Sequence, residues 1–301
     1  MRDVFSLATA QALPRNELRM LLQFALERDA AWLIAHDNDE LAEQQRSAIE
    51  SLISRRIAGE PIAYLIGERE FYGRAFQCSP AALIPRPETE LLVETTLALV
   101  PSPWGGGLGR GSPPAHSLPQ SNSLSPALPP GGRELRLLDI GTGTGCIAVT
   151  LALELPSLNV TAVDVSPAAL KLAQINAAHL GANIQFIESN WFTAIAPDAR
   201  FDLIVSNPPY IVPGDTHLSQ GDLRFEPAIA LADSVDGLQS YRELANGAMK
   251  HLNPGGWLIV EHGYDQGESV PALFRDAGFV DVEMKRDLAD LPRVTQARKL
   301  T

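Results

Sequence analysis

Residues 134–155 read ELRLLDIGTGTGCIAVTLALEL, an apolar run, a glycine-rich segment and a second apolar run in succession. The apolar run at 135–140 is typical of a buried strand, and residues 146–155 have a helical composition. Glycines between a strand and a helix let the backbone turn sharply and approach a ligand with no Cβ in the way. The stretch therefore predicts a strand, a ligand-binding turn and a helix in succession.

Further strand-like apolar runs follow this unit, at 159–165, 184–188, 201–207, 257–262 and 280–287. We expect helices between the first five strands and after the fifth, and one of them is expected to begin at Ser166-Pro167 with a capping serine and an N1 proline. Alternation of this kind predicts a Rossmann-like α/β fold, a mostly parallel sheet with helices on both faces. In such sheets ligands bind outside the carboxyl ends of the strands.

The first seventy residues have a different pattern. Apolar residues recur at helical spacing over 16–28, with Asn16 as the expected cap, and again over 40–58. Gly59-Glu60-Pro61 ends the second helix, because glycine suits a left-handed cap and proline cannot continue a helix. Residues 1–70 are thus expected to form a small helical bundle domain, either for substrate recognition or only to stabilise the fold.

Three segments follow the bundle. Residues 71–88 combine aromatic residues, glycine and proline, which predicts a hairpin or an extended linker. Residues 89–301 form the expected catalytic domain, which begins with a helix at 89–100. Within that domain, residues 101–133 are dominated by Gly, Pro and Ser, and this composition predicts a disordered insertion.

Composition excludes several classes of protein. The 301 residues carry a net charge of −12, which argues against direct nucleic-acid binding and suits a basic protein partner, although the charge also simply favours solubility. The absence of a long apolar run or a secretory signal predicts no membrane association and a cytoplasmic protein. The cysteines, Cys78 and Cys146, and the scattered histidines predict no metal site.

Three features predict a nucleoside-type cofactor. Gly141-Thr142-Gly143-Thr144-Gly145 follows an acidic residue, Asp139, which suits a ligand tail bearing an ammonium better than a pyrophosphate. Asp164 ends the next strand, where a carboxylate accepts hydrogen bonds from ribose hydroxyls. Trp191 follows the third strand beside Asn190, where an aromatic and an amide suit adenine. The alternatives are a structural turn, a surface acid and a core tryptophan.

Ser206-Asn207-Pro208-Pro209-Tyr210 closes the fourth strand and is the most specific motif. Two prolines force the chain out of the sheet. The side-chain carbonyl of Asn207 and the backbone carbonyl of Pro208 form two acceptors for one NH2 group, while Tyr210 is suited to stack on a planar group. Acceptors that steer the nitrogen lone pair and stabilise growing positive charge predict methyl transfer to a planar nitrogen.

These residues resemble the release factor glutamine methyltransferase family (also called PrmC or HemK) among the class I S-adenosylmethionine-dependent methyltransferases. The resemblance covers the chain except 101–133, and it rests on GEPIAYLIGEREFYG (59–73), IPRPETE (84–90), DIGTGTG (139–145), SNPPY (206–210), RFEP (224–227) and EHG (261–263). Asn-Pro-Pro-Tyr alone is shared with nucleic-acid amine methyltransferases, and its combination with PRPETE is more specific.

The resemblance implies transfer of a methyl group from S-adenosyl-L-methionine to the N5 amide nitrogen of the glutamine in the Gly-Gly-Gln motif of bacterial peptide chain release factors. It implies that residues 141–145, Asp164, Trp191 and Asn207 contact the cofactor. It further implies that Asn207, Pro208, Pro209 and Tyr210 contact the glutamine, with Asn207, Pro208 and Tyr210 as the catalytic group.

Asn190 departs from the family pattern, which has Asp before the tryptophan, and we expect a modest loss of cofactor affinity from it. Three alternatives remain: a methyltransferase acting on a ribosomal-protein glutamine, one acting on a nucleic-acid amine, and a protein that only senses a nucleotide. PRPETE argues against the first, the charge against the second, and the intact Asn-Pro-Pro-Tyr against the third.

Overall fold

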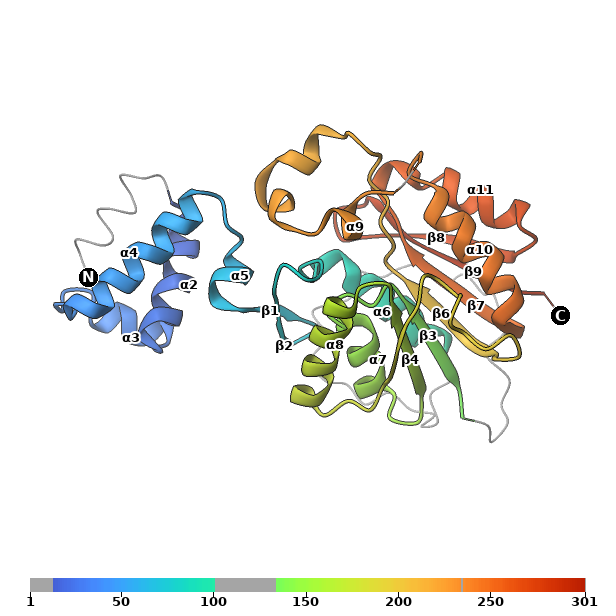
Figure 1. Cartoon of the computed structure of the whole chain (residues 1–301), viewed down its shortest axis with the longest axis horizontal. Coiled ribbons are helices and arrows are strands. Elements are labelled where there is room, and N and C mark those ends of the chain that lie inside the picture. Colours follow the sequence, from blue (N-terminus) through green and yellow to red (C-terminus); the bar gives the residue numbers. More distant parts are fainter. Residues whose placement is uncertain (1–12, 101–133, 234, 301) are drawn as a thin grey trace.

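The computed structural model describes residues 13–100, 134–233 and 235–300, so the insertion predicted to be disordered, 101–133, lies outside the described residues. Figure 1 shows a small helical domain at one end of an elongated molecule and a larger α/β domain at the other. None of the described helices is both long enough and apolar enough to span a membrane.

The helical domain is the predicted bundle with two additional short helices. Its helices are α2 (Arg15–Leu26), α3 (Ala30–Ala35), α4 (Glu43–Ile57) and α5 (Ile62–Ile66). Leu18, Leu21 and Leu22 of α2 pack against Ile49 and Ile53 of α4 in a core separate from the main one. Gly59 has a φ of +96°, the left-handed conformation predicted for the residue that ends the second helix.

A short hairpin connects the two domains, and the larger domain follows it. The hairpin strands are β1 (Glu68–Phe71) and β2 (Arg74–Gln77), which begin three residues before the segment predicted for them. The elements of the larger domain are η1 (Pro87–Thr89), α6 (Glu90–Leu99), β3 (Arg136–Ile140), α7 (Cys146–Glu154), β4 (Asn159–Asp164), α8 (Pro167–Leu180), β5 (Gln185–Glu188), β6 (Phe201–Ser206), η2 (Thr216–Ser219), η3 (Gly221–Phe225), α9 (Ala228–Leu231), α10 (Gln239–His251), β7 (Leu252–Glu261), η4 (Tyr264–Gln266), α11 (Ser269–Asp276), β8 (Val280–Arg286) and β9 (Pro292–Arg298).

The large sheet has seven strands in the order β5-β4-β3-β6-β7-β9-β8. Strands β3 to β7 are parallel, and β9 pairs antiparallel with both β7 and β8. The chain moves outward from β3 to β5 and then returns to place β6 beside β3. A reversal of this kind is the topological switch point at which doubly wound sheets bind ligands.

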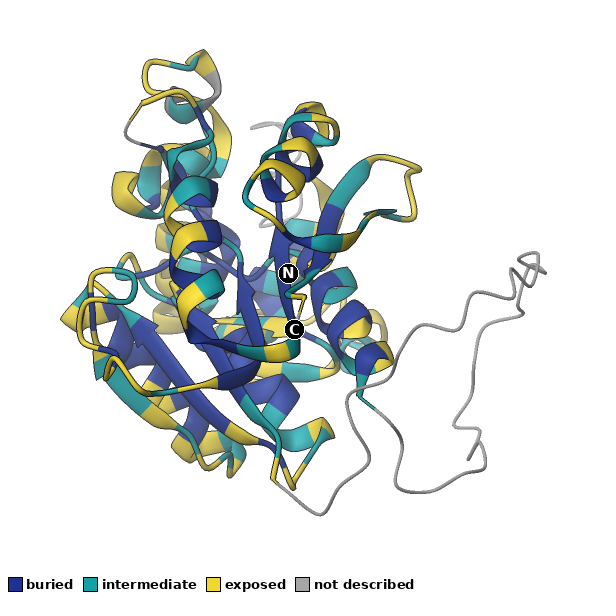
Figure 2. Cartoon of the chain, turned by 90° about the vertical axis from the view of Figure 1, so that its right-hand side faces the viewer, coloured by how far each residue is buried: buried dark blue, intermediate teal, exposed yellow. Residues whose placement is uncertain are grey.

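Helices cover both faces of this sheet, as predicted, because the strands are apolar on both sides. In β3, Leu137 joins the core formed with α6 and α7, while its neighbour Leu138 joins the core formed with α10 and α11. In Figure 2 the buried residues occupy the strands of the sheet and the sides of the helices that face it.

Three details of the prediction were wrong. Strand β9 was missed because it contains polar residues and so lacks an apolar pattern. Its Thr295 is buried and hydrogen-bonded to His262, and its Gln296 is buried and donates to Glu283. Residues 189–200, between β5 and β6, form turns instead of a helix. Helix α2 has Pro14 instead of Asn16 at its N-cap, and the Pro14 carbonyl accepts from Leu18 N.

Polar contacts tie the helical domain to the segment that follows β6. Arg56 of α4 pairs with both Glu17 and Asp222 (2.7 and 2.9 Å). Arg224 donates to the carbonyl of Ala58 at 2.6 Å. The domain on which we expected substrate recognition is therefore in contact with residues 221–225, which precede α9.

Candidate active site

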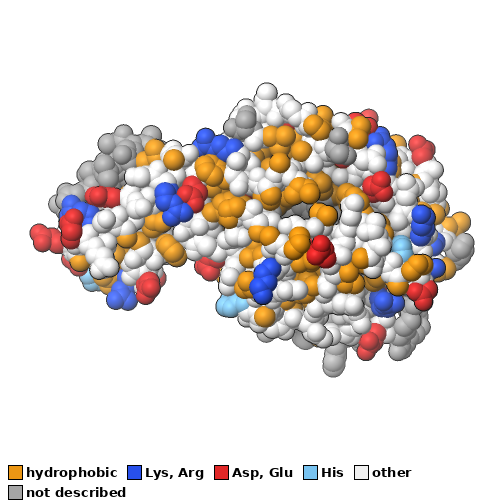
Figure 3. Space-filling view, in the orientation of Figure 1, with side chains coloured by type: hydrophobic (Ala, Val, Ile, Leu, Met, Phe, Trp, Pro, Cys, Tyr) orange, Lys and Arg blue, Asp and Glu red, His pale blue; other side chains and the backbone are white. Residues whose placement is uncertain are grey.

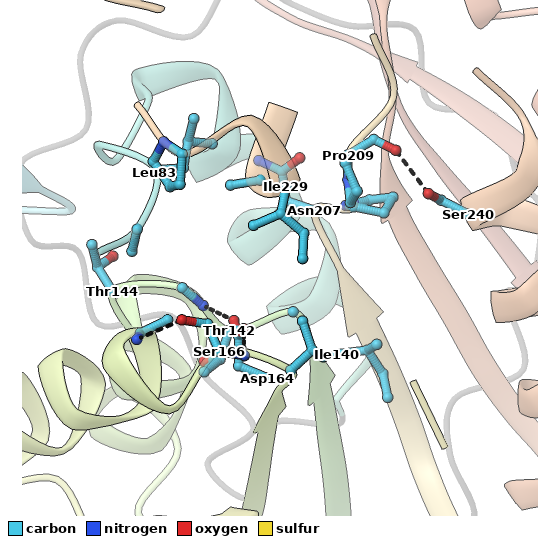
Figure 4. Close-up of a pocket in the computed structure, with 18 of the residues that line it drawn as sticks. Leu83, Ile140, Thr142, Thr144, Asp164, Ser166, Asn207, Pro209, Ile229 and Ser240 are labelled. Atoms are coloured by element: carbon cyan, nitrogen blue, oxygen red, sulfur yellow. Dashed lines mark hydrogen bonds between the residues drawn. The ribbon is translucent and has the colours of Figure 1, made fainter. Parts of the chain in front are cut away.

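A cavity of about 510 Å³ opens at the carboxyl ends of β3, β4 and β6, at the switch point. Its volume lies in the range of about 300–1,000 Å³ typical of small-molecule sites. Figure 3 shows a hollow near the middle of the molecule with hydrophobic side chains around it, and Figure 4 shows the cavity walls from inside. Most of the residues selected from the sequence line it: Gly141, Thr142, Gly143, Thr144, Asp164, Trp191, Asn207, Pro208 and Pro209.

The glycine turn between β3 and α7 forms the floor of the cavity. Gly145 has a φ of +81°, and a Cβ there would lie 3.1 Å from the Cβ of Ala173 on α8, so glycine is needed for both reasons. Asp139 lies beneath the turn, fully buried, and accepts a hydrogen bond from Thr142 Oγ1 at 2.6 Å. Burial raises the pKa of Asp139 to about 7.

Asp164, at the end of β4, is held by the same turn. One carboxylate oxygen accepts from the backbone N–H of Gly143 and the other from that of Ser166, both at 2.9 Å. Burial raises its pKa. Each oxygen keeps a further lone pair, so a carboxylate fixed in this way is able to accept from the two hydroxyls of a ribose.

Trp191 lies on the cavity wall in a left-handed conformation, with a φ of +52°. Ser189 Oγ donates to its carbonyl at 2.8 Å and holds the turn. The adjacent Phe192 ring stacks on His251, with centroids 5.4 Å apart, and a Cβ on Gly247 would lie 2.1 Å from this ring. Gly247 therefore provides the space in which Phe192, and with it Trp191, is anchored.

The Asn-Pro-Pro-Tyr motif leaves the sheet at the end of β6, as predicted from its prolines. Asn207 donates its side-chain N–H to Thr89 Oγ1 at 3.2 Å, and the Pro209 carbonyl accepts from Ser240 Oγ at 2.8 Å. Asn207 and Asp164 lie on opposite sides of the cavity in Figure 4. The two ends of the predicted site, one for the cofactor and one for the target nitrogen, therefore share one space.

Two of the selected residues do not line the cavity. Gly145 lies behind the turn, where it starts α7. Tyr210 packs against the core beside α10, and burial raises its pKa to about 12. Its backbone carbonyl accepts from Gln266 Nε2 at 3.3 Å.

A roof over the cavity comes from residues that the sequence analysis had left without roles. The carboxylate of Glu226, in the RFEP segment, pairs with Arg86 of PRPETE and accepts from the backbone N–H of Ile84 at 3.1 Å. This side chain is fully buried. The ion pair thus joins the two motifs across about 140 residues of sequence and places Pro227, Ile229 and Ala230 on the cavity wall.

The charged side chains of the cavity wall suit a cationic nucleoside cofactor. Among the described residues of the wall, the acidic ones are Asp164, Asp233 and Glu243, and the single basic one is Arg86, which is already paired. A phosphate-bearing ligand would require basic or bare amide groups instead. Leu83, Ile140 and Ile229 add apolar surface for a ring system.

Sheet topology, glycine turn and strand-end acid together define a class I methyltransferase. Comparison with known proteins agrees: residues 120–229 match the model of the methyltransferase small domain, and residues 5–67 match that of the PrmC N-terminal domain.

Curated relatives then identify the family. The release factor glutamine methyltransferase of Bordetella pertussis is 46% identical over 283 residues, which cover 94% of each chain. That of Escherichia coli is 40% identical over 299 residues, which cover 99% of this chain and 97% of the relative. The chain belongs to the release factor glutamine methyltransferase family, and it is S-adenosylmethionine-dependent.

Proposed function

We propose that this protein transfers the methyl group of S-adenosyl-L-methionine to the N5 side-chain nitrogen of the glutamine in the Gly-Gly-Gln motif of bacterial peptide chain release factors. The names of the curated relatives support this substrate. We further infer that the reaction takes place in the cytoplasm, because release factors act there on translating ribosomes.

One observation carries the chemistry. Asn207 and Thr89 both line the cavity, and the side-chain nitrogen of Asn207 is engaged by Thr89 Oγ1, so its side-chain oxygen is the end of the amide proposed to face a target NH2 group. An oxygen in that position accepts from an NH2 group and does not donate to it. The carbonyl of Pro208 is the proposed second acceptor.

Each side chain has a distinct task in the proposed reaction. When bound, the cofactor supplies an electrophilic methyl group on a positively charged sulfur. Asn207 and Pro208 hold both N–H bonds of the target amide, which turns the nitrogen lone pair toward that methyl group. As the nitrogen–carbon bond forms and the sulfur–carbon bond breaks, the same two oxygens stabilise the positive charge that develops on nitrogen before a proton leaves.

On the cofactor side, we propose that Asp164 accepts from the ribose hydroxyls and that Trp191 stacks on the adenine. Residues 141–145 would bring backbone groups close to the amino-acid tail. Tyr210 is also a proposed substrate contact. Its ring packs against the core in this structure, so it would reach a glutamine through the edge of the ring or after a side-chain rearrangement.

We propose that the helical domain binds the release factor. Its Arg56 and the Ala58 carbonyl contact Asp222 and Arg224, which lie just before the cavity roof. A protein bound across the helical domain would therefore touch the segment that roofs the cavity. The acidic net charge of −12 suits a partner with a basic surface.

Incubation with methyl-labelled S-adenosylmethionine tests the proposal. A release factor, its Gly-Gly-Ala variant, a ribosomal protein bearing a methylatable glutamine, and DNA are offered separately, and the label is located by mass spectrometry. We expect one methyl group on the Gly-Gly-Gln glutamine alone. Label on the ribosomal protein or on DNA, with none on the release factor, would overturn the assignment.

A further inference from the structure

We propose that Glu261, buried behind the cavity wall at the end of β7, is a positioning residue that fixes the side-chain amide of Asn207 with its oxygen toward the cavity. The proposal rests on the role given above to Asn207. Glu261 does not line the cavity, so it acts through its neighbours and not on the substrate.

Sheet register places the two residues side by side. Strands β6 and β7 are parallel, with Ser206 opposite Val260, so the next residues along each strand are Asn207 and Glu261. In-register residues on adjacent strands project from the same side of a sheet. The β6–β7 pairing therefore brings a carboxyl group to the side chain that the proposed chemistry needs oriented.

The three side chains lie together. Asn207 Nδ2 donates to Thr89 Oγ1 at 3.2 Å, and hydrogen-bonding interaction with Thr89 and, less strongly, with Asn207 opposes the rise in the pKa of Glu261 that burial causes. A hydroxyl that accepts from the amide has its own proton free for the carboxylate. When Glu261 is ionised it only accepts, and it then sets the direction of every bond in the group.

Direction matters because the two ends of an asparagine amide are nearly identical in shape. A half-turn of the amide would exchange its oxygen and nitrogen and would point a donor at the NH2 group of the target. Donor facing donor gives no hydrogen bond and no stabilisation of developing positive charge. An acceptor behind Asn207 excludes the turned form, because that form would place two oxygens against each other.

The cost of Glu261 supports a functional reason for its presence. The residue is 2% exposed, and its Oε2 has no hydrogen-bond partner within the described parts of the chain. A buried, incompletely paired carboxyl group destabilises a fold, so an apolar residue would stabilise β7 better. The same strand places apolar residues at Leu258, Ile259 and Val260, directly before it.

Two pairs of variants test the proposal on the full-length enzyme with a release factor as substrate. Glu261→Leu removes the acceptor, whereas Glu261→Gln keeps one acceptor oxygen at the same place. We expect Glu261→Leu to lower kcat about 100-fold, in line with the loss of one preorganised polar contact, with KM for the release factor and Kd for the cofactor changed less than about threefold. We expect Glu261→Gln to recover at least about tenfold of that loss.

Thr89→Val and Thr89→Ser supply the second pair, which decides the question if Glu261→Leu fails to fold. Valine removes the hydroxyl that links Asn207 to Glu261, and serine retains it. We expect the valine variant to be about tenfold slower in kcat than the serine variant, the value of one hydrogen bond to a charged partner. Equal kcat values within each pair, or losses confined to KM, would overturn the positioning role. Methylation of the release factor by the wild-type enzyme would still stand in that case, so the two proposals fail separately.

Discussion

Replacing Glu261 by glutamine is expected to make the protein more stable above neutral pH while it slows the reaction. Burial raises the pKa of Glu261 to about 7 from an ordinary value of 4.5, against the opposing effects of Thr89 and Arg293 and with a further rise from Glu88. The folded state therefore binds this proton more tightly than the unfolded chain does. As pH rises from 4.5 through 7, ionisation of Glu261 lowers the free energy of unfolding.

The size of the effect follows from the shift. A difference of about 2.5 pKa units at about 1.36 kcal/mol per unit is about 3 kcal/mol once the group is fully ionised. Glutamine resembles the protonated carboxyl group at every pH. We therefore expect Glu261→Gln to be more stable than wild type by about 3 kcal/mol at pH 8 and by under about 1 kcal/mol at pH 5.

Urea unfolding at pH 5, 6, 7 and 8, followed by circular dichroism, measures this difference. Glu94→Gln is the matched control, because it removes the same charge from an exposed position of α6 and is expected to change stability by less than about 0.5 kcal/mol. If Glu261→Gln were stabilised as much at pH 5 as at pH 8, or were less stable than wild type at pH 8, ionisation of Glu261 would not be what destabilises the fold.

Three further variants test other parts of the site. Asn207→Ala is expected to lower kcat by about 100- to 1,000-fold in the release-factor assay while isothermal titration still detects cofactor binding; near-normal turnover would refute its role. Gly247→Ala would place a Cβ 2.1 Å from the ring that anchors Trp191, so cofactor Kd is expected to rise at least tenfold, and an unchanged Kd would separate Trp191 from the adenine site. Gly59→Ala and Gly67→Ala both put alanine at a positive φ, at a cost of about 1–2 kcal/mol, but only the first also meets the guanidinium of Arg224, just before the roof. Only Gly59→Ala is therefore expected to raise KM for a release factor, and equal KM values would argue against a link between the helical domain and the roof.

The sequence predicted those parts of the fold that have a periodic or chemically singular signal. The six strands it located are rich in apolar residues, in runs or, in β8, in alternation, and the two prolines after Asn207 end a strand. Strand β9 was missed because Thr295 and Gln296 are buried through hydrogen bonds to the side chains of His262, which follows β7, and Glu283 of β8. A single polar residue gives no sign of a partner that the fold brings to it from elsewhere.

The candidate site likewise contains residues with a local sequence signal and residues whose contacts depend on distant parts of the chain. The sequence predicted that the glycine turn, Asp164 and Asn207 would lie at the cavity, because each follows a strand end, where ligands bind. Glu226 was present in a recognised motif, but its partner Arg86 lies 140 residues earlier, and nothing local predicts that the two meet in a buried ion pair. Pairing between distant motifs had to be seen in the structure.

Three buried carboxyl groups lie around the cavity, and their placement has a physical reason. Asp139 under the glycine turn, Glu226 in the roof and Glu261 behind Asn207 each lie within the shell around a single cavity, and burial raises the pKa of each. A carboxylate in such a shell fixes hydrogen-bond directions more firmly than a neutral group, because it only accepts. The stability lost by burying it is then offset by order at the site: Asp139 holds the turn through Thr142, Glu226 holds the roof through Arg86, and Glu261 holds the amide. Orientation of three separate walls by buried acids explains why an acidic protein has so little basic charge around a site that must receive a cation.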